Sequence, residues 1–232
     1  ISMCFSANAS FGAGVVLAAI GIASVKKVQQ APQIYFATIP LIFSIQQISE
    51  GFVWLSLTHP AFQFIQKPST YIFLYFAQVI WPIWLPLSIM KLEHFKKKQR
   101  LHYVFVIIGC LIAFYLGFCM IAYPVQAKIT GYHITYAQEY PIAFRGYGEF
   151  LYGLASIVPA FLSNVKRMWI IGVTIITSYL ITTFFYEEYI ISVWCFFATI
   201  ISVVVFFILE NIKKKTEGWN GYLNPQVQIT HH

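Results

Sequence analysis

The chain contains no aspartate, and charged residues make up only 10% of its 232 residues. An average soluble domain carries about 25% charged residues, so this composition excludes an ordinary soluble domain. Without aspartate, and with its histidines dispersed, the chain lacks the clustered His and Asp ligands of metal-dependent membrane hydrolases. Its four cysteines are too few and too scattered for a disulfide framework or a Cys-x-x-Cys zinc site.

Two further absences narrow the function classes. The last apolar run has no lysine in its middle, which excludes a retinal pigment that holds its chromophore through a Schiff base. The formal charge of +7 comes from short clusters between apolar runs. A nucleic-acid-binding protein would instead show a basic stripe with interleaved aromatic residues, so nucleic acid is not an expected partner.

The chain is rich in apolar residues, which make up 59% of it, and aromatic residues reach 19%. An α-helix needs about 20 apolar residues to cross a bilayer core of about 30 Å. Seven runs meet or approach that length, and they form one predicted transmembrane domain over residues 1–210. The predicted spans are 9–25, 34–57, 69–90, 102–123, 148–164, 168–186 and 189–210. Residues 211–232 form a polar tail, in which His231-His232 is typical of a purification-tag remnant.

Lysine and arginine orient these spans. Twelve of the fifteen basic residues lie at alternate ends of the runs, whereas Lys67, Lys128 and Arg145 lie on the other side. Cytoplasmic loops of membrane proteins hold an excess of Lys and Arg. The predicted fold is therefore an all-α bundle of seven transmembrane helices, with the N-terminus outside and the C-terminus in the cytoplasm.

The long connection between the fourth and fifth spans shows a strand pattern. Apolar and polar residues alternate on both sides of Thr130-Gly131, with Val125, Ala127 and Ile129 before it and Tyr132, Ile134 and Tyr136 after it. Period-two alternation around a short turn is typical of a β-hairpin. We expect the hairpin to lie over the outer mouth of the bundle.

The strongest candidate site lies in the second span. Glu50 is about seven residues from the outer end of this span, with Gln46 and Gln47 one turn deeper on the same helical face and Trp54 one turn further out. An ionisable group inside a membrane is costly and points to function. The group can hold a ligand, an ion or a proton, or it can be an interhelical hydrogen-bond network that only fastens helices together.

Other polar residues are expected around the same outer mouth. Glu149 opens the fifth span, Gln78 lies in the third, and Ser6 and Asn8 precede or open the first. The inner half of the bundle, apart from its basic ends, reads as nearly all apolar. Cys4, His59 and His133 are ligand types that suit zinc, but they lack the usual close spacing. No metal site and no cofactor are therefore predicted.

Three sequence patterns resemble those of an uncharacterised family of bacterial multi-span membrane proteins. They are the opening Met3-Cys4-Phe5-Ser6-Ala7 with Ser10-Phe11, the run Gln46-Gln47…Glu50-Gly51…Val53-Trp54, and Trp194-Cys195-Phe196-Phe197-Ala198. The resemblance covers most of the seven-span region. It implies residence in a bacterial inner membrane, with the lipid bilayer as partner, and it brings no known activity.

Three hypotheses for the function remain open at this point. The first is a membrane protein with an outward-facing polar pocket that binds, senses or transports a small molecule or ion. The second is a membrane-embedded enzyme for a lipid or lipid-linked substrate, with Cys4 as nucleophile or Glu50 as general base. The third is a structural or partner-binding membrane subunit. The sequence does not fix the oligomeric state.

Overall fold

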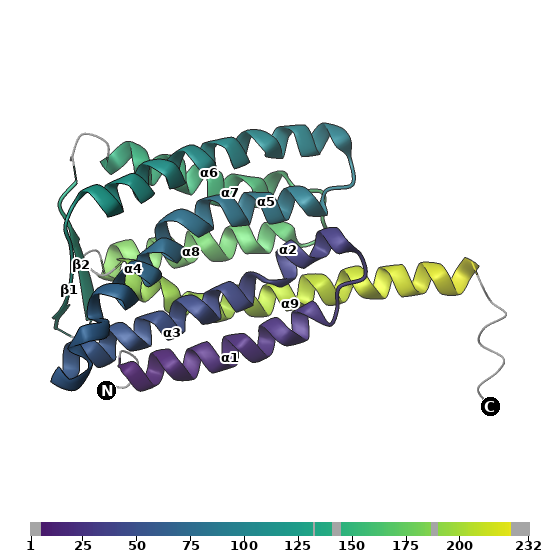
Figure 1. Ribbon diagram of the computed structural model, residues 1–232. Helices are drawn as coiled ribbons and strands as arrows, with labels where there is room; N and C mark the ends of the chain where they lie inside the picture. Colours follow the sequence, from purple (N-terminus) through teal and green to yellow (C-terminus); the bar gives the residue numbers. More distant parts are fainter. Residues whose placement is uncertain (1–5, 132, 141–144, 187–189, 224–232) are drawn as a thin grey trace, which may run out of the picture.

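The computed structural model describes residues 6–131, 133–140, 145–186 and 190–223, and among these the side chains of all but 145–146, 182–186, 190–196 and 215–223. Over these residues the chain forms helices that run along one common axis and a β-hairpin across one end (Figure 1). The elements are α1 (Ala7–Val25), η1 (Ala31–Gln33), α2 (Ile34–Ala37), α3 (Ile39–Thr58), η2 (Pro60–Ile65), α4 (Gln66–Tyr75), η3 (Phe76–Ile80), α5 (Trp81–Leu92), α6 (Lys96–Ala122), β1 (Val125–Thr130), β2 (His133–Gln138), α7 (Arg145–Leu162), α8 (Met168–Tyr186) and α9 (Ile190–Leu223).

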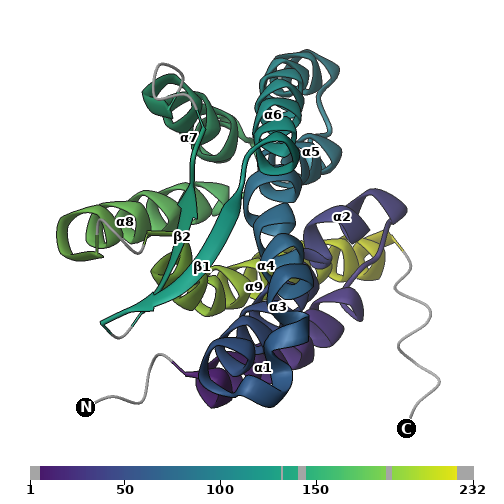
Figure 2. The same ribbon diagram turned by 60° about the vertical axis from the view of Figure 1, so that its left-hand side comes forward.

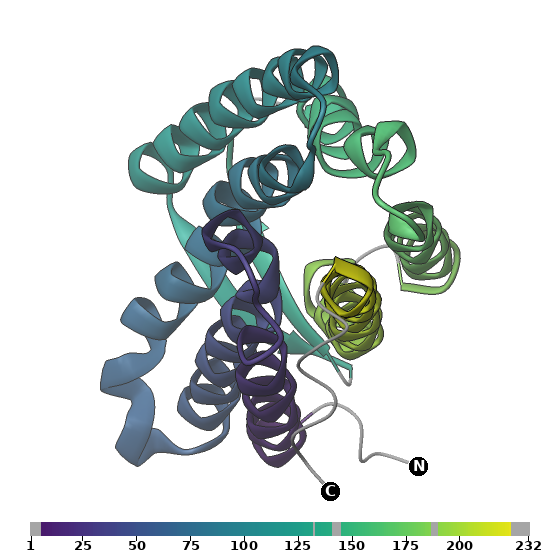
Figure 3. The same ribbon diagram turned by 90° about the vertical axis from the view of Figure 1, so that its right-hand side faces the viewer.

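The two ends of the bundle differ in composition. At one end, here the hairpin end, β1 and β2 lie across the helices (Figures 1 and 2). At the other, here the basic end, lie the end of α1, the α5–α6 and α7–α8 connections and the later part of α9, which projects beyond the other helices (Figures 1 and 3). The basic clusters of the sequence fall on these segments, namely Lys26-Lys27, Lys96–Lys98 with Arg100, Lys166-Arg167 and Lys213-Lys214.

Three helices among the described residues are long and apolar enough to cross a membrane, namely Ala7–Val25, the continuous path Pro60–Leu92 and Lys96–Ala122. Helix α6 also turns large apolar side chains outward, with Phe114 78% and Ile121 80% exposed. An apolar face of this kind fits contact with lipid and indicates membrane association. Helix α8 has the predicted bounds of its span, whereas α9 continues to Leu223, so part of the expected tail is helical.

Glycines bring α1 and α3 into close contact. A Cβ atom added to Gly14 would lie 2.6 Å from Cγ1 of Ile48, and one added to Gly51 would lie 2.7 Å from the ring of Phe11. The Ser44 hydroxyl also donates a 2.7 Å hydrogen bond to the Gly14 carbonyl. Small residues allow this close backbone approach in membrane helices, and here they place the polar face of α3 inside the bundle.

The path from α4 to α5 is widened into a π-helical turn, η3. The sequence offers two places for a proline kink, Trp81-Pro82 and Trp84-Leu85-Pro86, and the π-helical turn lies one turn before the first of them, at residues 76–80. A proline lacks the N–H that would bond to the carbonyl four residues before it, and its ring clashes with that carbonyl, so the distortion falls on the preceding turn. The hydroxyl of Tyr152 in α7 donates to the Ala77 carbonyl at 2.8 Å and satisfies one acceptor of this turn.

The β-hairpin forms where the alternation predicts it. Strands β1 and β2 pair antiparallel, with Val125 opposite Gln138 and Thr130 opposite His133. Gly131 lies in the turn with a φ of 61°, a conformation that glycine adopts without strain. Ala127 and Ile134 pack against Val53 and Trp54 of α3, so the hairpin is anchored on the bundle.

Candidate functional site

The polar face of α3 lies buried in the bundle. Glu50 is 2% exposed, and its Oε2 accepts a 2.9 Å hydrogen bond from Nε2 of Gln47. The Oε1 atom of Gln46 accepts a 2.6 Å bond from the indole N–H of Trp81 in α5. The Trp81 ring also packs on Phe43, with centroids 4.0 Å apart. The predicted stripe therefore faces the interior and contacts a second helix.

A second polar contact joins the π-helical turn to the hairpin. The Gln78 amide donates to Oε1 of Gln138 in β2 at 2.7 Å, and the Gln138 amide donates back to Oε1 of Gln78 at 3.3 Å. Gln78 and Trp81 lie three residues apart on one helical path. Polar contacts thus run from the hairpin through Gln78 and Trp81 to Gln46, on the helix that also carries Glu50.

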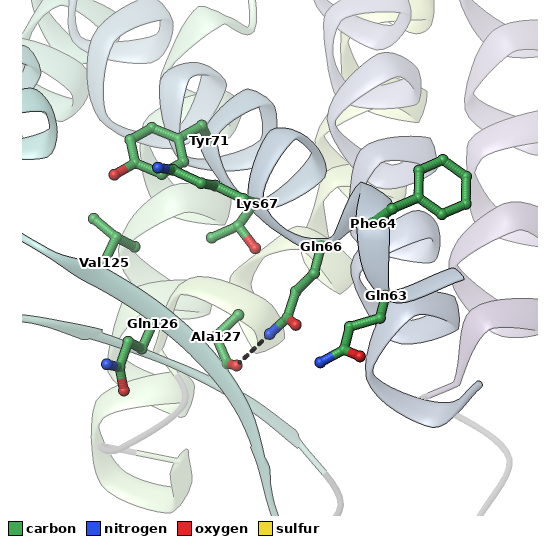
Figure 4. Close-up of a pocket in the computed structure, with 9 residues that line it drawn as sticks. Gln63, Phe64, Gln66, Lys67, Tyr71, Val125, Gln126 and Ala127 are labelled. Atoms are coloured by element: carbon green, nitrogen blue, oxygen red, sulfur yellow. Dashed lines mark hydrogen bonds between the residues drawn. The ribbon is translucent and has the colours of Figure 1, made fainter. Parts of the chain in front are cut away.

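A cavity of about 400 Å³ lies at the hairpin end, between β1 and the segment formed by η2 and α4. Drug-sized ligands occupy pockets of about 300–1,000 Å³, so this one has room for a small solute. Figure 4 shows the amide of Gln66 reaching from α4 toward the strand, where it donates a 3.2 Å bond to the Ala127 carbonyl. The lining residues are Gln63, Phe64, Gln66, Lys67, Thr70, Tyr71, Val125, Gln126 and Ala127.

The lining combines one cation with neutral hydrogen-bonding groups. Nζ of Lys67 lies 6.0 Å from the centroid of the Tyr71 ring, in the cation–π range. Thr70 is only 3% exposed, and its hydroxyl makes no hydrogen bond to any described residue. A buried hydroxyl without a partner is costly, and a ligand that supplies a partner removes that cost.

The structure separates the other predicted site residues. Trp54 is buried against the hairpin. Ser6 caps α1, because its hydroxyl accepts from the Ala9 N–H at 3.3 Å. Asn8 and Glu149 are exposed on α1 and α7. Cys4 lies outside the described residues.

The two histidines weighed as zinc ligands have different surroundings. His59 is exposed at the end of α3, with its Nδ1 2.9 Å from the Thr58 hydroxyl. His133 in β2 is 8% exposed, and burial lowers the pKa of its ring. Among the described residues, no three His, Cys, Asp or Glu side chains gather closely enough to hold a metal ion.

Sequence reasoning missed a buried ionisable pair at the basic end. Glu93, at the end of α5, is 2% exposed, and His102, in α6, is 0% exposed. Oε1 of Glu93 lies 3.7 Å from Nε2 of His102. The pair lies at the basic end, which the expectation of a nearly all-apolar inner half leaves out. Glu93-His94 reads as part of a loop, and nothing in the sequence shows that another loop covers Glu93.

Comparison with known proteins gives a family without a function. A model of the family of unknown function DUF6629 matches residues 3–218. No curated protein and no solved structure matches the chain. Since the match spans nearly the whole chain, this protein belongs to the DUF6629 family, which agrees with the resemblance to an uncharacterised family.

Proposed function

We propose that this protein is a seven-span membrane protein that binds a small polar solute from outside the cell and transmits that binding to the buried face of α3. Its hairpin end faces outward, and its basic end faces the cytoplasm, in accord with the excess of lysine and arginine there. This orientation opens the cavity between β1 and α4 to the exterior of an inner membrane.

The observation that carries this proposal is the lining of the cavity. Lys67 supplies a positive charge, Thr70 a buried hydroxyl without a described partner, and Gln63 and Gln126 supply amides. A compact solute with one anionic group and further hydrogen-bonding atoms matches this set. Few convergent polar groups in a concave, partly apolar site are typical of small-molecule sites.

The hairpin offers a path from the cavity to the buried polar face. Strand β1 lines the cavity, and its partner β2 carries Gln138, which exchanges two hydrogen bonds with Gln78. The same helical path carries Trp81, which donates to Gln46. A solute that shifts β1 therefore disturbs contacts that end on the helix of Glu50. This coupling fits a sensor or a carrier.

The proposal is tested by a thermal-shift screen of the purified protein against amino acids, dicarboxylates and hexose phosphates. We expect at least one compound to raise the midpoint, because a ligand that binds only the folded state stabilises it by mass action. In Lys67→Gln and in Thr70→Val, the solute concentration needed for the same rise of the midpoint should be at least tenfold higher. Lys128→Gln is the matched control, since Lys128 is an exposed basic residue of β1 outside the cavity lining. An equal loss in the control, or no response to any compound, counts against the proposal.

A second experiment separates function from packing at Glu50. Glu50→Gln keeps the volume of the side chain and an oxygen that accepts from Gln47, but removes its charge. We expect the free energy of unfolding of this variant to lie within about 0.5 kcal/mol of wild type, and that of Glu50→Ala to be lower by about 1 kcal/mol or more. If Glu50 takes part in transmission, Glu50→Gln should still bind the solute but lose the solute-induced change in hydrogen exchange of α3. A normal response in Glu50→Gln would assign the network a packing role alone.

A further inference from the structure

Glu93 fastens two connections at the basic end of the bundle. Its Oε1 accepts a 2.5 Å hydrogen bond from the Ser163 hydroxyl and a 2.8 Å bond from the Asn164 N–H, both in the α7–α8 connection. The Glu93 carbonyl accepts a 2.6 Å bond from the Gln99 amide at the start of α6. We call this set of contacts the Glu93 clasp.

A neighbouring lysine holds the same two connections. Nζ of Lys98 donates a 2.7 Å hydrogen bond to the carbonyl of Leu162, the last residue of α7. The clasp and Lys98 together join the α5–α6 connection to the α7–α8 connection, although they lie about 70 residues apart. Any change of charge inside the clasp therefore acts on the packing of four helices.

His102 lies inside this arrangement with unused hydrogen-bonding capacity. Its ring is fully buried, and neither ring nitrogen bonds to a described residue, nor does Oε2 of Glu93. A neutral imidazole has one donor and one acceptor, so burying both without partners is unfavourable. An apolar side chain of similar size would fill the space without that cost, which argues against a purely space-filling role.

The distance between the Glu93 carboxyl group and the His102 ring is compatible with the ring gaining and losing a proton. The 3.7 Å between Nε2 and Oε1 exceeds hydrogen-bond range, and closing it by less than 1 Å would form a charge-assisted bond. A protonated ring would donate to the carboxylate, and Oε2 of Glu93 could accept without displacing Ser163 or Asn164. The charged groups that act on the ring among the described residues are Glu93, which attracts a proton to it, and Lys98, which repels one.

We propose that Glu93 and His102 form a proton-binding site at the basic end, and that the proton it holds sets how tightly the α5–α6 and α7–α8 connections are joined. The His102 ring carries the proton, and Glu93 accepts the hydrogen bond that the protonated ring donates. The site is separate from the outer cavity, so this proposal stands or falls independently of solute binding. In the proposed orientation, its proton comes from the cytoplasm.

The direct test follows the ring signals of labelled histidine by NMR as the full-length protein is titrated in nanodiscs. The His102 ring should take up a proton within the pH range in which the protein stays folded. Glu93→Gln should move that uptake to lower pH, because it removes the attracting charge while the amide oxygen can still accept from Ser163 and Asn164. Lys98→Gln should move the uptake to higher pH, because it removes the repelling charge.

The matched control is Lys97→Gln, which removes an exposed lysine next to Lys98. It should leave the uptake of His102 unchanged. Hydrogen exchange of residues 162–168 gives a second readout. Once corrected for the intrinsic pH dependence of exchange, it should vary with pH in wild type and become independent of pH in His102→Gln.

Three outcomes would overturn the proposal. The first is a His102 ring that does not titrate in the folded protein. The second is a titration that Glu93→Gln does not move. The third is exchange at 162–168 that keeps its pH dependence in His102→Gln. If His102→Gln does not fold, the Glu93→Gln and Lys98→Gln shifts, which leave the ring in place, still decide the question.

Discussion

The two ends of the bundle bury polar groups in different ways. At the hairpin end the contact that joins β2 to the helices pairs two neutral side chains, the amides of Gln78 and Gln138. At the basic end a carboxylate is buried beside an imidazole, and the carboxylate accepts from a neighbouring connection. Neutral amides exchange hydrogen bonds without changing charge, whereas a carboxyl group and an imidazole can gain or lose a proton and so change charge. In the functions proposed above, the first end recognises a solute and the second responds to protons.

The largest expected effect concerns which end faces which compartment. Reporter fusions after Lys27, Arg100, Lys166 and Lys215 should behave as cytoplasmic, and fusions near His59, Gly131 and Glu188 as external. The readout is the activity of a paired periplasmic and cytoplasmic reporter, which should differ in an all-or-none manner. An external reporter after Arg100, or an internal one near Gly131, would contradict the proposed orientation of both ends.

The next largest effect should come from breaking the Glu93 clasp. Glu93→Ala removes the acceptor for the Ser163 hydroxyl and the Asn164 N–H, both in part-buried hydrogen bonds. Hydrogen bonds to a charged group contribute about 1.5–3 kcal/mol each, so we expect a loss of about 3 kcal/mol or more. Denaturant unfolding in detergent measures it, with Glu149→Ala as the control because Glu149 is an exposed glutamate. Equal losses in both variants would show that the clasp does not stabilise the basic end.

A smaller loss is expected at the hairpin end. Gln78→Ala removes both amide contacts to Gln138, and neutral hydrogen bonds contribute about 0.5–1.5 kcal/mol each. The variant should lose about 1–2 kcal/mol, and hydrogen exchange of β2 should rise more than that of α9. Gln63→Ala, which changes an exposed glutamine of η2, should lose little. If β2 exchanges as in wild type, the amide pair does not hold the hairpin down.

The smallest effect should come from His133 in β2. Burial lowers the pKa of its ring, so the neutral ring is the form that the docked hairpin favours. Stability from this group is present above the unfolded pKa of about 6.5, and is lost as pH falls from there through the lower folded pKa. Once corrected for the intrinsic pH dependence of exchange, the exchange of β2 should therefore increase toward acid pH, and His133→Gln should reduce that increase. His59→Gln, at an exposed histidine, should not.

The helices and the hairpin could be predicted from the sequence, because each depends on a local pattern of residues. The alternation around Thr130-Gly131 predicted the hairpin, and the apolar runs predicted the helices with errors of several residues at their ends, the largest in α9. The interior position of Gln46, Gln47 and Glu50 also followed, since a polar stripe on an apolar helix must avoid lipid. Local patterns carried this much of the structure.

Features formed by segments that are distant in the sequence could not be predicted in this way. The cavity exists because β1 lies against α4, with Gln66 bonded to Ala127, and no local pattern gives that distance. The sequence places Glu93 in a basic loop and His102 at the start of a span, and it gives no sign that Ser163 and Asn164 cover Glu93. Ser6 was read as a ligand-binding residue, but its position at the start of α1 favours a helix cap. Burial of a short loop depends on which other loop covers it.

The π-helical turn η3 has a consequence for how the length of this chain can vary. A π-helical turn accommodates one residue more than an α-helical turn while the flanking helices keep their faces. Deleting one residue within 76–80 would thus leave Phe73 and Trp81 directed as they are. The same deletion would remove the widening that accommodates Pro82, along with the hydrogen bond that the Tyr152 hydroxyl donates to the Ala77 carbonyl. A shortened chain should keep its bundle only if position 82 also loses its proline. Among related sequences, we therefore expect the extra residue in the turn and the proline that follows it to be present together or absent together.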